Sequence, residues 1–176
     1  MSLMDYVLIS CRALIGTVFL LSAVGKIRGR RRYTDFVTAV RGLAPGLPAR
    51  GVAPAVIAAE AAVVVLLLRT ESAAPGFVVA LGLLAAFTAA IGAAVAKDRR
   101  VACQCFGASS APVGAAHLVR NGVLLAAAAS GLAATLGGTA TGLRAEVVLT
   151  ALATGVAVAV MTSFTDDIAH LFRPLD

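Results

Sequence analysis

Five long apolar runs decide what this chain can fold into. A helix needs about 20 mostly apolar residues to cross the hydrocarbon core of a bilayer, and each run has about this length and lacks the alternation of a strand. Charged residues make up only 14% of the chain, against about 25% in soluble domains. The sequence therefore predicts one all-α transmembrane domain over residues 1–176, a helical bundle with spans at about 6–24, 52–68, 76–96, 118–136 and 145–164.

Turn-forming residues separate the runs. Pro45, Gly46 and Pro48 precede the second run, and Pro75 precedes the third. Between the first and second runs, the sequence is polar and basic, and we expect a loop there. The net charge of +6 does not indicate nucleic acid, because the basic residues fall between apolar runs and not along one soluble face. We therefore expect a lipid bilayer, and no nucleic acid, as the surroundings of this chain.

The distribution of basic residues predicts the orientation. Five spans place the loops after the first and third runs on the same side as the C-terminal tail, whereas Arg69 and Arg144 lie on the other side. Positive charge marks the cytoplasmic face, so we expect a multi-pass plasma-membrane protein with its N-terminus outside and its C-terminus in the cytoplasm. The run 28–32 is interpreted as a topology signal that contacts lipid headgroups. The basic residues on the predicted cytoplasmic side are Lys26, Arg28, Arg30, Arg31, Arg32, Arg41, Arg50, Lys97, Arg99, Arg100 and Arg173.

The segment VACQCFGASS, residues 101–110, holds two of the three cysteines. A disulfide between Cys103 and Cys105 would be strained, and strained disulfides are easily reduced, which favours a catalytic or sensing pair. Basic neighbours before the pair, with His117 and Arg120 after it, would favour the reactive thiolate. Two other interpretations stay open: inert thiols at a membrane edge, or a soft-metal site in which His117 joins the two thiolates.

Three further residues stand inside the apolar runs. Cys11 is interpreted as a packing residue on the outer side of the membrane. Arg12 should lie roughly 10 Å from the outer edge and Glu60 roughly 13 Å from the inner edge, so long side chains can join them. We predict an intramembrane Arg12–Glu60 pair that is structural, with a polar pocket for a quinone or for protons as the alternative.

Several segments together resemble the MauE branch of the MauE/DoxX family of redox-associated membrane proteins. They are CQCFG, HLVRN, RALIGTVFLLSAVGK, YTDFVTAVRGLAP and PAVIAAEAAVVVLLL, and they cover residues 12–125. The resemblance implies an association with methylamine utilisation and with disulfide formation in a dehydrogenase subunit, alongside a thioredoxin-like partner. DoxX-type relatives are linked to thiol, sulfur and quinone redox. By motif position, Cys103 and Cys105 would be the redox pair, and the matching polar positions are Lys26, Glu60, His117, Arg120 and Asn121.

The sequence and the resemblance together predict a membrane thiol–disulfide redox protein. Cys103 and Cys105 would exchange electrons with a thioredoxin-like or other thiol protein, and a quinone is the cofactor to consider. The alternative is a non-enzymatic assembly subunit of a larger membrane complex, in which the cysteine pair is structural or binds a soft metal.

Overall fold

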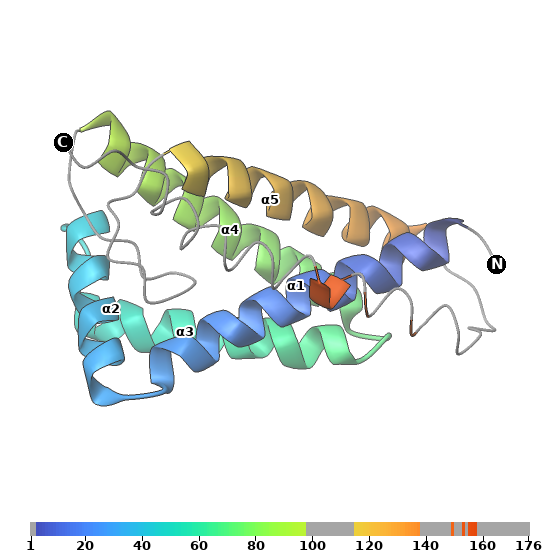
Figure 1. Ribbon diagram of the computed structural model, residues 1–176, viewed down its shortest axis with the longest axis horizontal. Helices are drawn as coiled ribbons and strands as arrows, with labels where there is room; N and C mark the ends of the chain where they lie inside the picture. Colours follow the sequence, from blue (N-terminus) through green and yellow to red (C-terminus); the bar gives the residue numbers. More distant parts are fainter. Residues whose placement is uncertain (1–2, 98–114, 138–148, 150–152, 154, 158–176) are drawn as a thin grey trace.

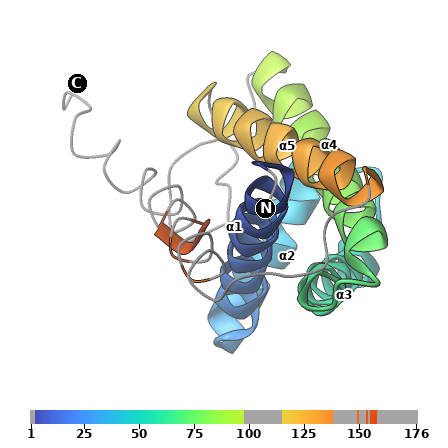
Figure 2. The ribbon, with the colours of Figure 1, turned by 90° about the vertical axis from the view of Figure 1, so that its right-hand side faces the viewer.

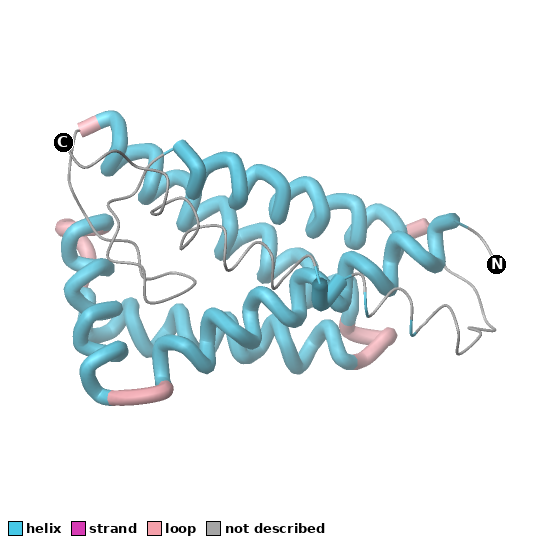
Figure 3. Tube along the Cα trace, in the orientation of Figure 1, coloured by secondary structure: helices cyan, strands magenta, loops and turns pink. Residues whose placement is uncertain are grey.

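The computed structural model describes residues 3–97, 115–137, 149, 153 and 155–157. Within these residues the chain forms α-helices joined by short turns, and no strand (Figure 3). The predicted all-α membrane bundle is thereby confirmed. The helices are α1 (Leu3–Ile27), α2 (Arg30–Leu43), α3 (Ala49–Leu68), α4 (Ala73–Ala96) and α5 (Ala115–Leu136).

Four of these helices are long and apolar enough to cross a bilayer. They are Met4–Ile27, Ala49–Leu68, Ala73–Ala96 and His117–Leu136, each within three residues of a run predicted from the sequence. The third begins earlier than predicted because Pro75 falls in the first turn of α4, where a missing backbone N–H breaks no intrahelical hydrogen bond. The chain is therefore a multi-pass membrane protein.

The spans alternate in direction (Figure 1). α1 ends, α3 begins, α4 ends and α5 begins at one end of the bundle, and α2 lies across that end (Figures 1 and 2). We call it the α2 end. The core between the spans holds large, fully buried side chains and many alanines. Small residues let helices approach closely in lipid, where van der Waals packing drives association.

α2 was expected to be a loop, and this expectation is wrong. Its buried residues are Phe36, Ala39 and Val40, which repeat with the spacing of an amphipathic helix. Phe36 and Val40 pack against Ala49 and Ala53 in the first turns of α3. Such a helix contains no long apolar run, because only one of its faces is apolar, and a prediction based on apolar runs does not identify it.

The fifth predicted span, 145–164, lies largely outside the described residues and stays a prediction. Its described residues are helical, and Gly155 sits directly on α1. A Cβ added at Gly155 would lie 2.5 Å from Ala13 Cβ and 2.8 Å from the backbone nitrogen of Leu14. Only a glycine fits so close to the backbone of α1.

Candidate functional site

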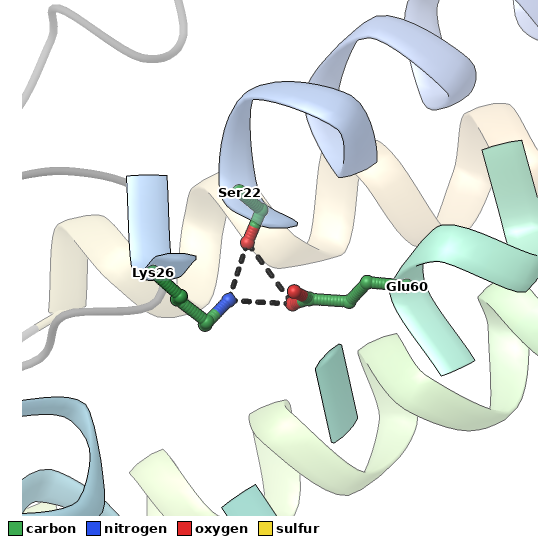
Figure 4. Close-up of polar contacts among 3 residues, drawn as sticks. All are labelled: Ser22, Lys26 and Glu60. Atoms are coloured by element: carbon green, nitrogen blue, oxygen red, sulfur yellow. Dashed lines mark hydrogen bonds and ion pairs between the residues drawn. The ribbon is translucent and has the colours of Figure 1, made fainter. Parts of the chain in front are cut away.

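A buried ion pair joins α1 to α3 near the α2 end (Figure 4). Lys26 Nζ lies 2.6 Å from Glu60 Oε1. Ser22 Oγ accepts a hydrogen bond from Lys26 Nζ at 2.6 Å and donates one to Glu60 Oε1 at 3.0 Å. The three side chains are almost inaccessible to solvent, with exposed fractions of 2% for Ser22, 3% for Lys26 and 0% for Glu60. They form a closed triangle of polar contacts inside an apolar bundle.

Helix geometry explains how these side chains meet. Ser22 and Lys26 are four residues apart and therefore lie on the same face of α1, the face turned toward α3. Phe36 of α2 covers the ammonium group, with Lys26 Nζ 4.9 Å from its ring centroid, a distance at which a cation–π contact is favourable. Opposite charges and a hydrogen-bonding hydroxyl offset part of the cost of removing both ions from water.

The second oxygen of Glu60 is an exception in this network. Glu60 Oε2 is buried and has no hydrogen-bond partner among the residues that the structure describes. A buried acceptor without a donor costs about 1–3 kcal/mol, and more when it is charged, so such an atom in a native site calls for an explanation. Chemically, Oε2 can accept a proton or a hydrogen bond from a small group that reaches it.

The first turns of α5 bring further polar side chains to the same end. His117, Arg120 and Asn121 have exposed fractions of 6%, 9% and 0%. Asn121 Nδ2 donates to Thr88 Oγ1 of α4 at 3.3 Å, while Asn121 Oδ1 is a second buried acceptor with no donor in the described part of the chain. The four supporting residues named from the sequence, Lys26 included, are thus all buried and all lie toward the α2 end.

Cys103 and Cys105 lie outside the described residues. α4 ends at Ala96, and the described chain resumes at Ala115 as the start of α5. Both of these helix termini are at the α2 end (Figure 1). The cysteine pair therefore belongs to the connection between the two helices that carry Thr88 and Asn121, and its own geometry remains a prediction.

The predicted Arg12–Glu60 pair is wrong. Arg12 donates from Nε and Nη2 to the carbonyl oxygen of Leu67, at 2.8 and 2.6 Å, and from Nη1 to Thr70 Oγ1 at 3.3 Å. The last carbonyls of a helix have no intrahelical donor, and in lipid they must be satisfied by the protein. Arg12 therefore caps the end of α3 in the structure, while Glu60 bonds to Lys26.

The relative register of α1 and α3 explains the error. The prediction assumed that both helices start and end at the same membrane edges. However, the first turns of α3 pack beside α2, and Glu60 is eleven residues, or about 16 Å, beyond Ala49. This shift brings Glu60 level with Ser22 and Lys26 and leaves Arg12 at the opposite end of α3.

Two residues of the site were not named as site residues from the sequence. Ser22 could have been found from its four-residue spacing to Lys26, and Phe36 from the amphipathic pattern of α2.

Cys11, interpreted as a packing residue, is buried in the main core cluster and forms no disulfide. A Cβ added at Gly131 of α5 would come within 3.0 Å of Cys11 Cβ, which shows how tightly α5 packs there.

Comparison with known proteins identifies a family. Residues 4–134, about three quarters of the chain, match the family described as methylamine utilisation protein MauE. No curated protein matches the sequence, and no solved structure matches the fold. The matched region contains the first three described spans and all but the last two residues of the fourth. It also contains the Ser22–Lys26–Glu60 network and the buried polar start of α5. The chain is a multi-pass membrane protein that belongs to the MauE family.

Proposed function

We propose that this protein carries out thiol–disulfide exchange at the membrane through Cys103 and Cys105, with a thioredoxin-like or other dithiol protein as partner. One observation carries the proposal. The bundle buries an ion pair with an unpartnered carboxylate oxygen, toward the end at which the cysteine-bearing segment connects α4 to α5. Membership of the MauE family supports the same membrane setting.

The exchange transfers two electrons. A thiolate of the reduced partner attacks one sulfur of the Cys103–Cys105 disulfide, forms a mixed disulfide and releases the other sulfur as a thiolate. The second partner thiolate then attacks the mixed disulfide, so that the partner leaves oxidised and the cysteine pair is reduced. Two protons accompany the two electrons, from the partner thiols to the released thiolates. The reduced pair then passes two electrons and two protons either to another disulfide, which becomes a dithiol, or to a quinone, which becomes a quinol.

Buried polar groups near the α2 end support this chemistry. Cationic groups stabilise a thiolate and raise its share at neutral pH, and Lys26 and Arg120 are held there in low-dielectric surroundings. Glu60 Oε2 has the free acceptor capacity to take up a proton as a thiol ionises. We propose Lys26, Glu60, His117, Arg120 and Asn121 as positioning residues for the pair, and Cys103 and Cys105 as the reacting residues.

Charge supports an orientation for this site. The exposed basic residues at the α2 end are numerous, whereas Arg69 is the exposed basic residue at the other end of the described bundle. Under the positive-inside rule, the α2 end faces the cytoplasm and the N-terminus lies outside. The exposed basic residues at the α2 end are Arg28, Arg30, Arg31, Arg32, Arg41, Arg50 and Lys97.

Trapping of the mixed disulfide tests the proposal. The full chain, in a Cys11→Ser background, is purified in detergent with either Cys103→Ser or Cys105→Ser and mixed with thioredoxin whose resolving cysteine is replaced by serine. The single remaining cysteine is first oxidised to an activated mixed disulfide. It should then form a covalent complex with the thioredoxin variant, and dithiothreitol should release this complex. The Cys103→Ser/Cys105→Ser double variant is the control and should give none.

Three results would overturn the proposal. A covalent complex at equal yield with the double variant would mean that the cysteine pair is not the reacting site. No complex from either single-cysteine variant, together with intact assembly of the double variant into a larger membrane complex in cells, would favour the assembly subunit. Stoichiometric zinc or copper, lost in the double variant, would assign the pair to metal binding.

A further inference from the structure

A second site lies at the opposite end of α3 from the α2 end. A cavity of about 340 Å³ is lined by α1, by α3 and by Val156. Arg12 and Thr17 are its polar lining residues, and the rest of the lining is aliphatic or glycine. Leu20 and Leu68 at its rim are exposed, so the cavity opens sideways, toward the lipid. It is separate from the Ser22–Lys26–Glu60 network and does not depend on the proposed exchange chemistry.

The Arg12 guanidinium lies level with the end of the α3 span. Its guanidinium bonds to Leu67 and Thr70, where the span of α3 ends and the turn into α4 begins. A guanidinium carries five N–H donors, and three donor–acceptor contacts are formed. Two N–H donors are therefore left for another acceptor beside the cavity.

No carboxylate of the described part of the chain neutralises the charge of Arg12. The carbonyl and hydroxyl oxygens that it contacts are dipoles and leave the positive charge uncompensated. A cation at the edge of the hydrocarbon region is costly unless it is paired, so this position favours an anionic partner.

The remainder of the cavity suits a hydrocarbon chain. Its lining follows α1 inward from Arg12 to Leu20, eight residues or about 12 Å along the helix. Val64 lines the facing side on α3. A charged group at the end of the α3 span, beside an apolar cleft of this length, matches an amphiphile with an anionic head and an acyl tail.

We propose that this cavity binds one anionic phospholipid. Its phosphate accepts hydrogen bonds from the two remaining Arg12 N–H donors, and one acyl chain lies along Gly16 and Val64. Pairing with the phosphate offsets the desolvation of the guanidinium and leaves its cap on Leu67 in place. The positive charge of Arg12 selects an anionic over a zwitterionic headgroup, because a choline ammonium would bring a second cation to the site.

Two substitutions test the binding of the headgroup and of the acyl chain separately. Arg12→Gln removes the charge. Gly16→Leu fills the cleft, and it is expected to fold because a Cβ at Gly16 meets no atom within 4 Å and leucine favours a helix over glycine. The matched controls are Arg69→Gln, an exposed arginine at the same end, and Gly82→Leu, at an open and exposed position on α4.

Native mass spectrometry of the delipidated full chain in detergent measures the binding. Dioleoyl phosphatidylglycerol is titrated, with dioleoyl phosphatidylcholine and dioleoylglycerol as comparison ligands. We expect one phosphatidylglycerol per chain, bound at least tenfold more tightly than either comparison ligand. Gly16→Leu and Arg12→Gln should each weaken it at least tenfold, whereas both controls should bind like the parent. If Arg12→Gln does not fold without its cap on α3, the Gly16→Leu comparison still decides.

Other results would overturn the proposal. Equal affinity of the parent and of Gly16→Leu for phosphatidylglycerol would mean that the lipid binds nonspecifically to the apolar surface. Equal binding of dioleoylglycerol would mean that the cleft holds a chain without recognising phosphate. Binding of a short-chain ubiquinone that displaces the phospholipid and is lost in Gly16→Leu would assign the cavity to a quinone. A dimer that Gly16→Leu abolishes would assign it to a second copy of the chain.

Discussion

Lys26 Nζ and Glu60 Oε1 form an ion pair at 2.6 Å across the interface of α1 and α3, and both side chains are buried. Removing one partner of a buried ion pair leaves an uncompensated charge, which typically costs about 3–5 kcal/mol. Lys26→Met alone should therefore lower the free energy of unfolding by about 3 kcal/mol or more. The double variant Lys26→Met/Glu60→Gln should recover at least half of this loss. Denaturant titration in detergent micelles measures both.

Arg41→Met is the control for this comparison. Arg41 is an exposed cation of α2 at the same end of the bundle, and its removal should change stability by less than about 0.5 kcal/mol. A double variant that is no more stable than Lys26→Met alone would show that the two charges do not stabilise each other.

Ser22 bridges the pair with a hydroxyl that both accepts and donates. Ser22→Ala removes both hydrogen bonds in a buried setting, and we expect a loss of about 1–3 kcal/mol. Ser130→Ala is the matched control, because the hydroxyl of Ser130 is exposed and bonds only to a carbonyl of its own helix. Thermal melting of both variants in the same detergent tests the difference, and equal melting temperatures would contradict it.

Gly131 of α5 packs directly against the side chain of Phe77 on α4. A Cβ there would lie 2.3 Å from Phe77 Cζ and 3.0 Å from Cys11 Cβ. Gly131→Ala should therefore destabilise the bundle by about 1–3 kcal/mol, since overpacking forces neighbouring side chains and helices apart. Gly122→Ala lies on the same helix with no atom within 4 Å of the added Cβ, and it should be neutral or stabilising by up to about 1 kcal/mol. The reverse order of stabilities would refute this packing.

Labelling of intact cells tests the orientation. In a Cys11→Ser variant, Cys103 and Cys105 should react with a membrane-permeant maleimide after reduction, and not with an impermeant one, because the α2 end is proposed to face the cytoplasm. The control variant adds Thr70→Cys, at an exposed position in the turn at the opposite end, and this cysteine should react with the impermeant reagent. Reduction-dependent labelling of Cys103 and Cys105 by the impermeant reagent would place the pair outside.

The spans could be predicted from the sequence because hydropathy and length are local properties. The four described spans agree with the predicted runs to within three residues. Lys26 and Asn121 were named from their motif positions in the resembled family, and both are buried near the α2 end. The spans follow from what single segments require in lipid, whereas these two residues came from the resemblance.

Pairing between helices could not be predicted in the same way. The partner of Glu60 depends on how far α3 slides past α1, and this register is set by the packing of Phe36 and Val40 on Ala49 and Ala53. Without α2, helix depths alone placed Glu60 nearer to Arg12. The amphipathic spacing of α2 indicates a helix with one buried face. This helix predicts the register of α3, and so the partner of Glu60, only once α2 is known to pack on α3.

The central claim is that Cys103 and Cys105 form a two-electron redox couple. The most direct measurement equilibrates the Cys11→Ser protein in glutathione buffers of graded potential and counts free thiols by mass-tag alkylation. The account predicts that both thiols appear together, with a tenfold change in the reduced-to-oxidised ratio for about 30 mV, and that Glu60→Gln shifts the midpoint. Two thiols that stay reduced at every potential, or that change independently of each other, would contradict the account.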